Sequence, residues 1–367
     1  MSTLFKDLFS PAFYQQLVRD LTQVLPELDG ERFIANIYLP DFEQLEMKQR
    51  ITRTVEALHP FMPQQFGAAT KVLLSLVENL ESNQENDDAL QYLFIPEYVE
   101  RYGLEDLDNA IVALERITQF ITCEFAIRPF IVKYPQAMEK QMLAWTAHSH
   151  RRVRRLASEG CRPRLPWGMA ISTYKQDPTN ILPILEALKD DECEVVRRSV
   201  ANNFNDIAKD NPKVVIDFAT SNIGVNTPRD KLIKHACRTL LKQAEPNVMA
   251  LFGFDSQGIE LTHFSLAEPQ VKVGGEINFE FEVHNQTNQS KKLRLEYGIY
   301  YQKHNGTLSR KVFKISEREI SAGELYKVTR KQSFKIITTR KFHPGLHQVS
   351  IILNGQEWQR LDFELLD

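Results

Sequence analysis

The spacing of the apolar residues changes once along this chain, and the change separates two kinds of structure. Up to about residue 254, apolar side chains recur every three or four positions, which predicts amphipathic helices. Beyond the glycine-containing segment 253–258 they alternate with polar residues, as Ile277, Phe279 and Phe281 do, which predicts half-buried strands. We therefore predict a helical domain over residues 1–254 and a separate strand domain over residues 258–367.

Three segments of the helical part resemble one another. The segment 148–160 (HSHRRVRRLASEG) aligns with 191–203 (DECEVVRRSVANN), with 43 residues between their arginine pairs, and 230–242 (DKLIKHACRTLLK) follows 37 residues later. Helix pairs that repeat about every 40 residues predict a HEAT-like α-helical solenoid, in which each pair buries its apolar face on its neighbours. Such stacking places the paired cations on one surface. These pairs are Arg154-Arg155, Arg197-Arg198 and Lys234-His235.

Turn signals divide the strand part. Asn305-Gly306 and Asn354-Gly355 are strong hairpin dipeptides, and His343-Pro344-Gly345 is a further break. These breaks predict about seven strands in an antiparallel β-sandwich of immunoglobulin type. The sandwich has no disulfide, because all four cysteines of the chain precede it (Cys123, Cys161, Cys193 and Cys237). We expect these cysteines to be buried thiols.

Composition and charge narrow the class of protein. With 43% hydrophobic and 25% charged residues the chain is globular, and it has neither a membrane-length apolar run nor a signal-like amino terminus. We expect a cytoplasmic protein. Its net charge of −3 is made of −11 over residues 1–130, +6 over 131–254 and +2 over 255–367. The basic middle suits an anionic partner such as a nucleic acid, and a solvated helical face is the alternative.

Several enzyme classes lose support because their motifs are missing. The chain has no GxxxxGK[ST] loop, no GxGxxG after a strand, no GxSxG elbow and no HExxH. It also lacks a CxxC pair. We therefore expect neither a metal nor a nucleotide or other cofactor.

Most of the candidate functional residues lie in the segment RRVRRLASEGCRPRLPWGM at 151–169, where six arginines surround Glu159 and Trp167. Arginine forks suit phosphates, but a carboxylate among them repels DNA. The alternative for Glu159 is an internal salt bridge that orients one arginine, and the alternative for Trp167 is a place in the core. Asp206, in the segment VANNFNDIAKDNP, is either a surface acid or, with the repeats stacked, a group on the same surface as Glu159.

Taken together, these blocks resemble a known family. The SEGCRPRLPWG and VRRSVANNFNDIAKDNP blocks, the repeated arginine helices and the terminal strand domain look like the AlkC branch of the bacterial AlkC/AlkD alkylpurine DNA glycosylases, which have HEAT-like repeats. The resemblance covers essentially the whole chain. The strand domain favours AlkC over AlkD, which ends after its helical repeats.

The resemblance implies a monofunctional DNA glycosylase. It would hydrolyse the N-glycosidic bond of cationic N3-methylated bases, 3-methyladenine and 3-methylcytosine, in alkylated DNA without flipping the base. Matching block by block, the catalytic residues implied are Asp206, Glu159, Trp167 and Glu124, the last from the short segment TCEF. The carboxylates would stabilise the oxocarbenium ion and position water, with Asp206 the first choice for the water.

Double-stranded DNA is the partner implied, bound by a monomer. The candidate DNA-binding residues are Arg152, Arg155, Arg162, Arg164, Arg198, Asn202, Lys234 and Arg238 on the helices, and Lys303, Arg310, Lys311, Arg340 and Lys341 near turns of the sandwich. One reading ties some of these arginines to internal carboxylates instead. The alternative function is a HEAT-repeat scaffold without catalysis, which binds damaged or branched DNA or a protein partner.

Overall fold

The computed structural model describes residues 4–83, 90–336 and 341–367. It divides into two compact units. The helical unit comprises Met1–Val215 and Asn222–Ala236, and the C-terminal unit comprises Ile216–Ser221 and Cys237–Asp367. The predicted order of a helical region followed by an immunoglobulin-like sandwich is confirmed.

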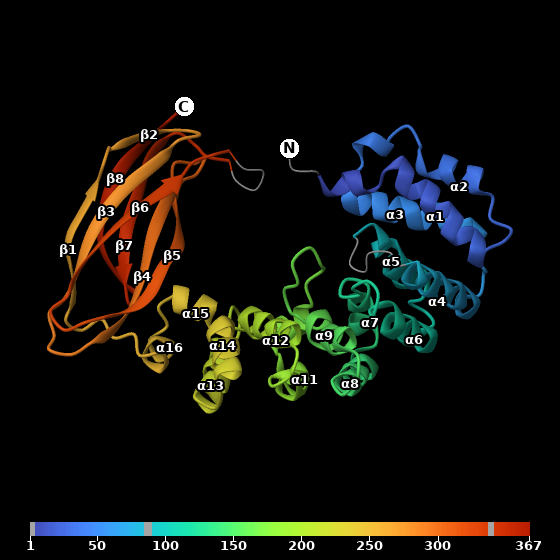
Figure 1. The fold of residues 1–367 in the computed structure, drawn as a ribbon, viewed down its shortest axis with the longest axis horizontal. Coiled ribbons are helices and arrows are strands. Elements are labelled where there is room, and N and C mark those ends of the chain that lie inside the picture. The colour runs from blue at the N-terminus through green and yellow to red at the C-terminus, as the bar shows by residue number, and fades with distance from the viewer. Residues whose placement is uncertain (1–3, 84–89, 337–340) are drawn as a thin grey trace. The chain divides into compact units, whose positions relative to one another are not determined.

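Helices fill the described chain up to residue 251 (Figure 1). The α-helices are α1 (Pro11–Val24), α2 (Gly30–Ile37), α3 (Met47–Leu58), α4 (Phe66–Ser82), α5 (Phe94–Tyr102), α6 (Leu107–Ile117), α7 (Ile127–Lys133), α8 (Pro135–Trp145), α9 (Arg151–Gly160), α10 (Ser172–Gln176), α11 (Leu182–Leu188), α12 (Glu194–Ile207), α13 (Pro212–Asn222), α14 (Thr227–Ala236), α15 (Arg238–Lys242) and α16 (Pro246–Leu251).

Local sequence sets where these helices begin. At α1 the Ser10 hydroxyl accepts a hydrogen bond from the Phe13 amide at 3.2 Å, and Pro11 occupies the first turn. Both features are typical of a helix start, because the cap satisfies an amide that has no partner within the helix. Leu17 and Leu21 are then buried on one face. This helix therefore has the start and the buried face that its local sequence favours.

The repeated segments form one layer of the helical unit. Helix α12 packs between α9 and α14, α8 packs on α9, and α11 contacts both α9 and α12 (Figure 1). Ser158 of α9 contacts Ser199 of α12, and Arg162, just after α9, contacts Asp206 near the end of α12. The two helices therefore run in the same direction, and equivalent positions of successive repeats lie side by side.

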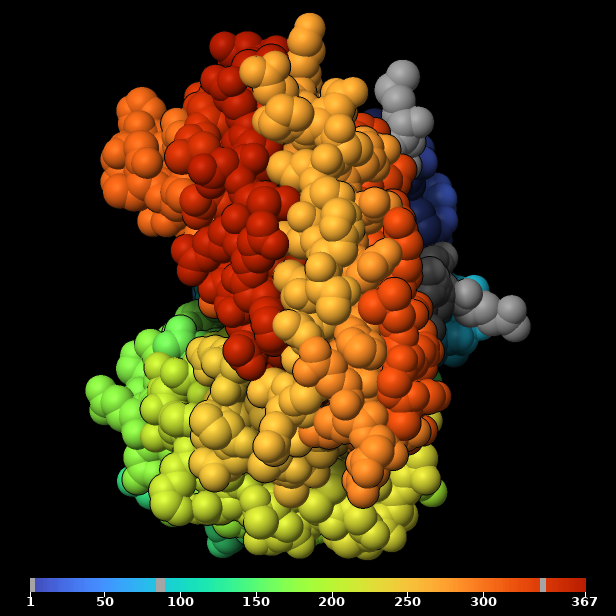
Figure 2. Space-filling view, turned by 90° about the vertical axis from the view of Figure 1, so that its left-hand side faces the viewer, coloured from blue at the N-terminus to red at the C-terminus, as the bar shows by residue number. Residues whose placement is uncertain are grey.

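The C-terminal unit contains a two-sheet sandwich. Its strands are β1 (Ile259–Leu266), β2 (Gln270–Lys272), β3 (Glu276–Asn285), β4 (Lys291–Gln302), β5 (Leu308–Ile320), β6 (Leu325–Ser333), β7 (Gly345–Leu353) and β8 (Gln356–Leu366). One sheet has the order β1-β3-β6 and the other β2-β8-β7-β4-β5. The described strands thus number eight, one more than predicted, because the short β2 pairs in parallel with β8. Figure 2 shows the edge at which β1 runs beside β8.

Alternating residues make the core between the sheets. Ile277, Phe279, Phe281 and Val283 of β3 are each at most 2% exposed, as the alternation predicts. At the β7–β8 hairpin, Asn354 and Gly355 have φ of +47° and +82°, values that Asn-Gly tolerates well. Turn chemistry and strand periodicity therefore agree with the predicted sandwich.

The unit boundary lies earlier than the change in periodicity. Helices α15 and α16 belong to the C-terminal unit, where Gly355 approaches Ala244, and Asn354 donates to the carbonyl of Asp255 at 2.7 Å. The predicted linker 253–258 therefore packs against the sandwich. A split at 254–258 marks where the helices end, and whether it separates independently folding domains stays a prediction.

Candidate functional site

Two buried carboxylates from neighbouring repeats share one arginine. Arg162 donates from Nη1 to Glu159 Oε1 at 2.6 Å and from Nε to Asp206 Oδ2 at 2.8 Å. Glu159 and Arg162 are each 5% exposed and Asp206 is 1% exposed. Burial acts to lower the pKa of Arg162, but the two carboxylates outweigh it and raise that pKa. The guanidinium therefore stays charged and holds both acids in place.

Hydroxyl and amide groups of α9 and α12 form further hydrogen bonds around Glu159. The Ser199 hydroxyl donates to Glu159 Oε2 at 2.6 Å and lies 2.6 Å from the hydroxyl of Ser158. Asn203 Nδ2 donates to the Ser158 carbonyl at 2.8 Å. Each oxygen of Glu159 thus has a fixed donor, so the carboxylate is oriented by both repeats.

The same chain of ion pairs continues in both directions. Arg155 Nη1 donates to Glu124 Oε2 at 2.7 Å, and Arg155 Nη2 lies 3.9 Å from Glu159 Oε1. At the other end Lys209 Nζ donates to Asp206 Oδ1 at 2.9 Å. Glu124, Arg155, Glu159, Arg162, Asp206 and Lys209 therefore alternate in charge along one line, which we call the ion-pair chain. It joins all three carboxylates implied by the resemblance.

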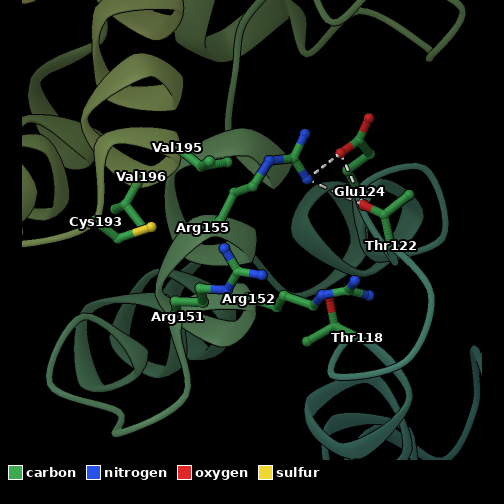
Figure 3. A pocket seen from close by; sticks show the side chains of 9 residues that line it. All are labelled: Thr118, Thr122, Glu124, Arg151, Arg152, Arg155, Cys193, Val195 and Val196. Atoms are coloured by element: carbon green, nitrogen blue, oxygen red, sulfur yellow. Dashed lines mark hydrogen bonds and ion pairs between the residues drawn. The ribbon is translucent and has the colours of Figure 1, made fainter. Parts of the chain in front are cut away.

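Glu124 and Arg155 line a hollow of about 310 Å³ (Figure 3). Arg155 reaches across from α9 to Glu124 and to the Thr122 hydroxyl, 3.2 Å away. The Glu124 side chain is 12% exposed. The remaining lining residues are Thr118, Arg151, Arg152, Cys193, Val195 and Val196. Three arginines face this hollow, so it is a basic recess despite the carboxylate.

The first arginine of each of the two arginine pairs binds backbone carbonyls. Arg154 Nη1 donates to the carbonyls of His148 and Ser149, six and five residues upstream. Arg197 Nη1 donates in the same way to the carbonyls of Asp191 and Glu192. Arg154 and Arg197 therefore each bind the loop that precedes their own helix.

The second members face open recesses. Arg155 lines the hollow of Figure 3, and Arg198 and His235 line another of about 350 Å³ between α12 and α14. His235 Nε2 lies 2.8 Å from Asn202 Oδ1. Arg197 lines this second recess too, so both members of that pair contribute to the surface that the repeats share.

Trp167 is not a core residue, so the core alternative is wrong. Its side chain belongs to the loop after α9, and the residue is 60% exposed with a φ of +64°. The ring meets Phe5 edge-on with 6.2 Å between centroids, and the Trp167 carbonyl accepts a hydrogen bond from Lys48 Nζ. An exposed indole on a strained backbone is available to a ligand.

Beside Trp167 lies a second hollow of about 280 Å³, lined also by Phe125, Met169, Glu97 and Glu100. Burial, and then the nearby Glu97, raise the pKa of Glu100 to about 7. Glu97 is held by Thr52 at 2.5 Å and by Arg101 at 3.1 Å. This hollow therefore combines aromatic walls with a carboxyl group that titrates near neutrality.

The remaining predicted DNA-binding residues differ in their surroundings. Arg152 donates to the Phe120 carbonyl, Arg164 pairs with Asp210 at 2.7 Å, and Lys234 is half-buried. Arg162 is enclosed by its two carboxylates, so we assign it to the ion-pair chain instead of a phosphate contact. Arg238 is exposed at the start of α15, in the C-terminal unit.

In the sandwich, four predicted cations gather near the β4–β5 turn. A hollow of about 360 Å³ there is lined by Lys303, Arg310, Lys311, Lys341 and by neighbours that include His304 and His343. Arg340 lies outside the described residues. The structure thus brings together Arg310 and Lys311 of β5, Lys303 of the β4–β5 turn and Lys341 of the segment before β7.

Three polar residues of the site were missed. The sequence could have indicated Lys209, because it follows Asp206 by three positions and i,i+3 pairs of opposite charge lie on one helical face. No local pattern indicated Lys48 or Arg128, because each contacts a segment far away in the sequence. No group of three His, Cys, Asp or Glu side chains in the described ranges is placed to hold a metal, and no described helix is long and apolar enough to cross a membrane.

Known proteins are similar to this chain over its whole length. Residues 73–240 match the family described as DNA alkylation repair enzyme, and residues 260–367 match the C-terminal Ig-like domain of YhaZ. The chain is 39% identical to the uncharacterised protein YhaZ of Bacillus subtilis, over 98% of this chain and 99% of that one. It also matches the Pseudomonas fluorescens alkylpurine DNA glycosylase AlkC, solved with DNA that contains an abasic site analogue. That match has 32% identity, a TM-score of 0.92 and full coverage of both chains.

The chain belongs to the AlkC branch of the alkylpurine DNA glycosylases. The resemblance stated from the sequence is therefore confirmed. The match to AlkC includes the sandwich as well as the helices, so the whole architecture is that of this branch. Within this AlkC-type protein the ion-pair chain, the Trp167 loop and the basic recesses lie on the region that matches the DNA alkylation repair family.

Proposed function

We propose that this AlkC-type protein is a monofunctional glycosylase that removes cationic N3-methylated bases, 3-methyladenine and 3-methylcytosine, from double-stranded DNA. The observation that carries the proposal is the ion-pair chain, in which three carboxylates are fixed beside arginine-lined recesses. A protein that only binds DNA gains nothing from carboxylates held near phosphates.

The chemistry of the substrate explains why carboxylates suffice. Methylation at N3 puts a positive charge on the base, which then leaves with little help from an acid. As the glycosidic bond lengthens, the deoxyribose becomes an oxocarbenium ion. A fixed negative charge stabilises that ion better than water does, because it needs no reorganisation during the reaction.

Asp206 and Glu159 would take different parts in this step. Asp206 would position the attacking water, and Glu159 would stabilise the sugar cation. Both oxygens of Asp206 have partners, but Lys209 has a side chain that is 39% exposed. DNA phosphates would compete for Lys209 and leave Asp206 Oδ1 open to water, while the buried Arg162 keeps the other oxygen in place.

Trp167 and Glu124 would complete the site. The exposed indole would lie against the sugar and add a cation–π contribution. Glu124, paired with Arg155, would extend the negative field from the neighbouring helix. We propose that the base is not flipped into an enclosed pocket, since these groups line open recesses, and that the protein acts as a monomer on bent duplex.

The test is base release by the purified protein. Duplex DNA that carries N3-methylated bases is incubated with the protein, with and without EDTA, and the released bases are identified by mass spectrometry. We expect release that EDTA does not change. Borohydride should trap no covalent complex, because a water attacks rather than a lysine.

A different result would favour the alternative function. Tight binding of damaged or branched DNA without any base release would indicate a HEAT-repeat scaffold. Release that depends on a trapped lysine intermediate would contradict the monofunctional assignment, and Lys209 would then be the first residue to examine.

A further inference from the structure

Arg128, at the start of α7, is buried beneath the loop that links the ion-pair chain to Trp167. It is 0% exposed, and its three nitrogens donate to three backbone carbonyls. Nη1 bonds Gly160 and Nη2 bonds Arg162, both at 2.8 Å, and Nε bonds Met169 at 2.6 Å. These carbonyls belong to the last residue of α9 and to both ends of the following loop. Arg128 thus closes the loop 161–169 from beneath.

The surroundings of Arg128 are unusual for a buried cation. Within the described residues, no carboxylate lies at ion-pair distance from it. Burial, and then the charge of Arg162, lower its pKa to about 10. A buried charge that has only carbonyl partners is costly compared with an apolar side chain of the same size. Such a residue is explained better by the geometry it imposes than by its contribution to stability.

Two glycines allow the loop to approach Arg128. A Cβ at Gly160 would lie 2.7 Å from Ile127 Cγ2, and one at Gly168 would lie 3.0 Å from Leu165 and 3.4 Å from Arg128 Cδ. The end of α9 and the loop therefore rest directly on α7 and on the stem of Arg128. A shift of the Arg128 side chain would therefore displace the loop, because the two are in close contact.

The loop carries both kinds of group that the proposed reaction needs. Arg162 holds Glu159 and Asp206, and Trp167 presents its indole to solvent. Outside the loop, Lys48 bonds the Trp167 carbonyl and Phe5 meets the indole edge-on. Arg128 is thus the buried side chain that ties the end of α9 to both ends of the loop that carries Arg162 and Trp167.

We propose that Arg128 is a positioning residue of the site: it fixes the loop 161–169 and thereby places Trp167 and Arg162 relative to the two buried carboxylates. It acts through backbone carbonyls and touches neither DNA nor the reacting atoms. The inference rests on the proposed function for its effect on rate, but its structural effect is measured separately.

The experiment uses the full-length protein labelled with 5-fluorotryptophan. Its three tryptophans, Trp145, Trp167 and Trp358, give three ¹⁹F resonances, and Trp167→Phe identifies one of them. In Arg128→Met we expect the Trp167 resonance to shift or broaden while the other two stay in place. Single-turnover base release should fall roughly 100-fold, the order expected for a misplacement of about 1 Å, with DNA affinity nearly unchanged.

Arg128→Lys and Arg154→Met complete the set. Lysine keeps the charge and one of the carbonyl bonds, so its rate should lie between those of Arg128→Met and the wild type. Arg154 is also buried and holds a loop of the same unit, but at the opposite end of α9. Arg154→Met should lower the melting temperature without moving the Trp167 resonance or the rate per folded molecule.

The outcomes separate this inference from the proposed function. A wild-type protein that releases no base defeats the function, while the ¹⁹F spectra still report whether Arg128 sets the loop. An active wild type, together with an unchanged Trp167 resonance and rate in Arg128→Met, overturns the positioning role. A shift of equal size in Arg154→Met overturns it as well, because any buried arginine would then have the same effect.

Discussion

Arg162 and Asp206 are 44 residues apart in the sequence, yet Arg162 Nε donates to Asp206 Oδ2 at 2.8 Å inside the helical unit. Their separation is close to the 43-residue spacing of the first two repeated segments. Stacking of repeats therefore creates the contact. Breaking a buried pair by removing one partner typically costs about 3–5 kcal/mol. For substitutions in this pair, the free energy of unfolding must therefore be measured together with the activity.

Asp206→Asn is expected to abolish most base release. The amide keeps the shape of the side chain but removes the charge that would position water, so we expect a loss of about 10²–10³-fold in single-turnover rate. DNA affinity should stay the same or rise slightly, because a negative charge near phosphates is removed. The measurements are single-turnover kinetics and a binding titration at a temperature well below the melting transition of the variant.

Asp210→Asn is the matched control for Asp206→Asn. Asp210 lies four residues later, is exposed, and pairs with Arg164 at 2.7 Å. The Asp210→Asn substitution removes the same charge but leaves every residue of the ion-pair chain unchanged. Equal losses of rate in the two variants would mean that the charge acts only through the general field of the protein.

Glu100→Gln is expected to change how stability depends on pH. Burial and Glu97 raise the pKa of Glu100 from its ordinary value of 4.5 to about 7, so the folded protein holds this proton more tightly than the unfolded chain does. The resulting stability is present below pH 4.5 and is lost as the pH rises to about 7. The wild type should lose about 1–3 kcal/mol more than Glu100→Gln over this window.

Urea denaturation of both proteins at pH 5 and pH 8 measures this difference. Glu31→Gln on α2 is the control, because Glu31 is exposed. Parallel pH profiles for the wild type and Glu100→Gln would show that the Glu100 carboxyl is already ionised in the folded protein at pH 5.

Charge reversal in the sandwich tests its predicted role on DNA. Lys303→Glu with Lys341→Glu reverses two cations of the hollow near the β4–β5 turn. If they bind phosphates, duplex affinity should fall at least 10-fold at low salt and less at high salt. Lys327→Glu with Lys331→Glu on β6 is the matched control, because those lysines pair with glutamates of β3. A similar loss in both double variants would indicate a nonspecific charge effect.

The fold could be predicted because its signals are local. The switch from helical to alternating periodicity, the Ser10 cap and the Asn354-Gly355 turn each act within a few residues. The unit boundary was not accessible in this way. It depends on α15 and α16 packing against the sandwich, a long-range contact that leaves no mark on periodicity.

The candidate site was predicted in part for the same reason. Repeat spacing brought Glu159 and Asp206 to one place, since stacked repeats align equivalent positions. It did not indicate that the first arginine of each pair would bind backbone carbonyls, because the carbonyls that hold Arg154 and Arg197 belong to loop conformations. Arg128 had no signal at all, since its partners are backbone atoms of residues that lie 32 to 41 positions away.

Arg155→Ala and Arg154→Ala together test whether the recurring cations bind DNA. Arg155 faces the open hollow of Figure 3, whereas Arg154 is buried and pairs with Asp191 at 2.6 Å. For each phosphate neutralised, log affinity should fall with log salt at a slope of about −0.9. Arg155→Ala should therefore make the slope about one unit shallower for duplex of any sequence, and Arg154→Ala should leave the slope intact but lower the melting temperature. If Arg155 serves only as the internal partner of Glu124, both variants will lose thermal stability, and the salt dependence of labelled duplex binding will match that of the wild type.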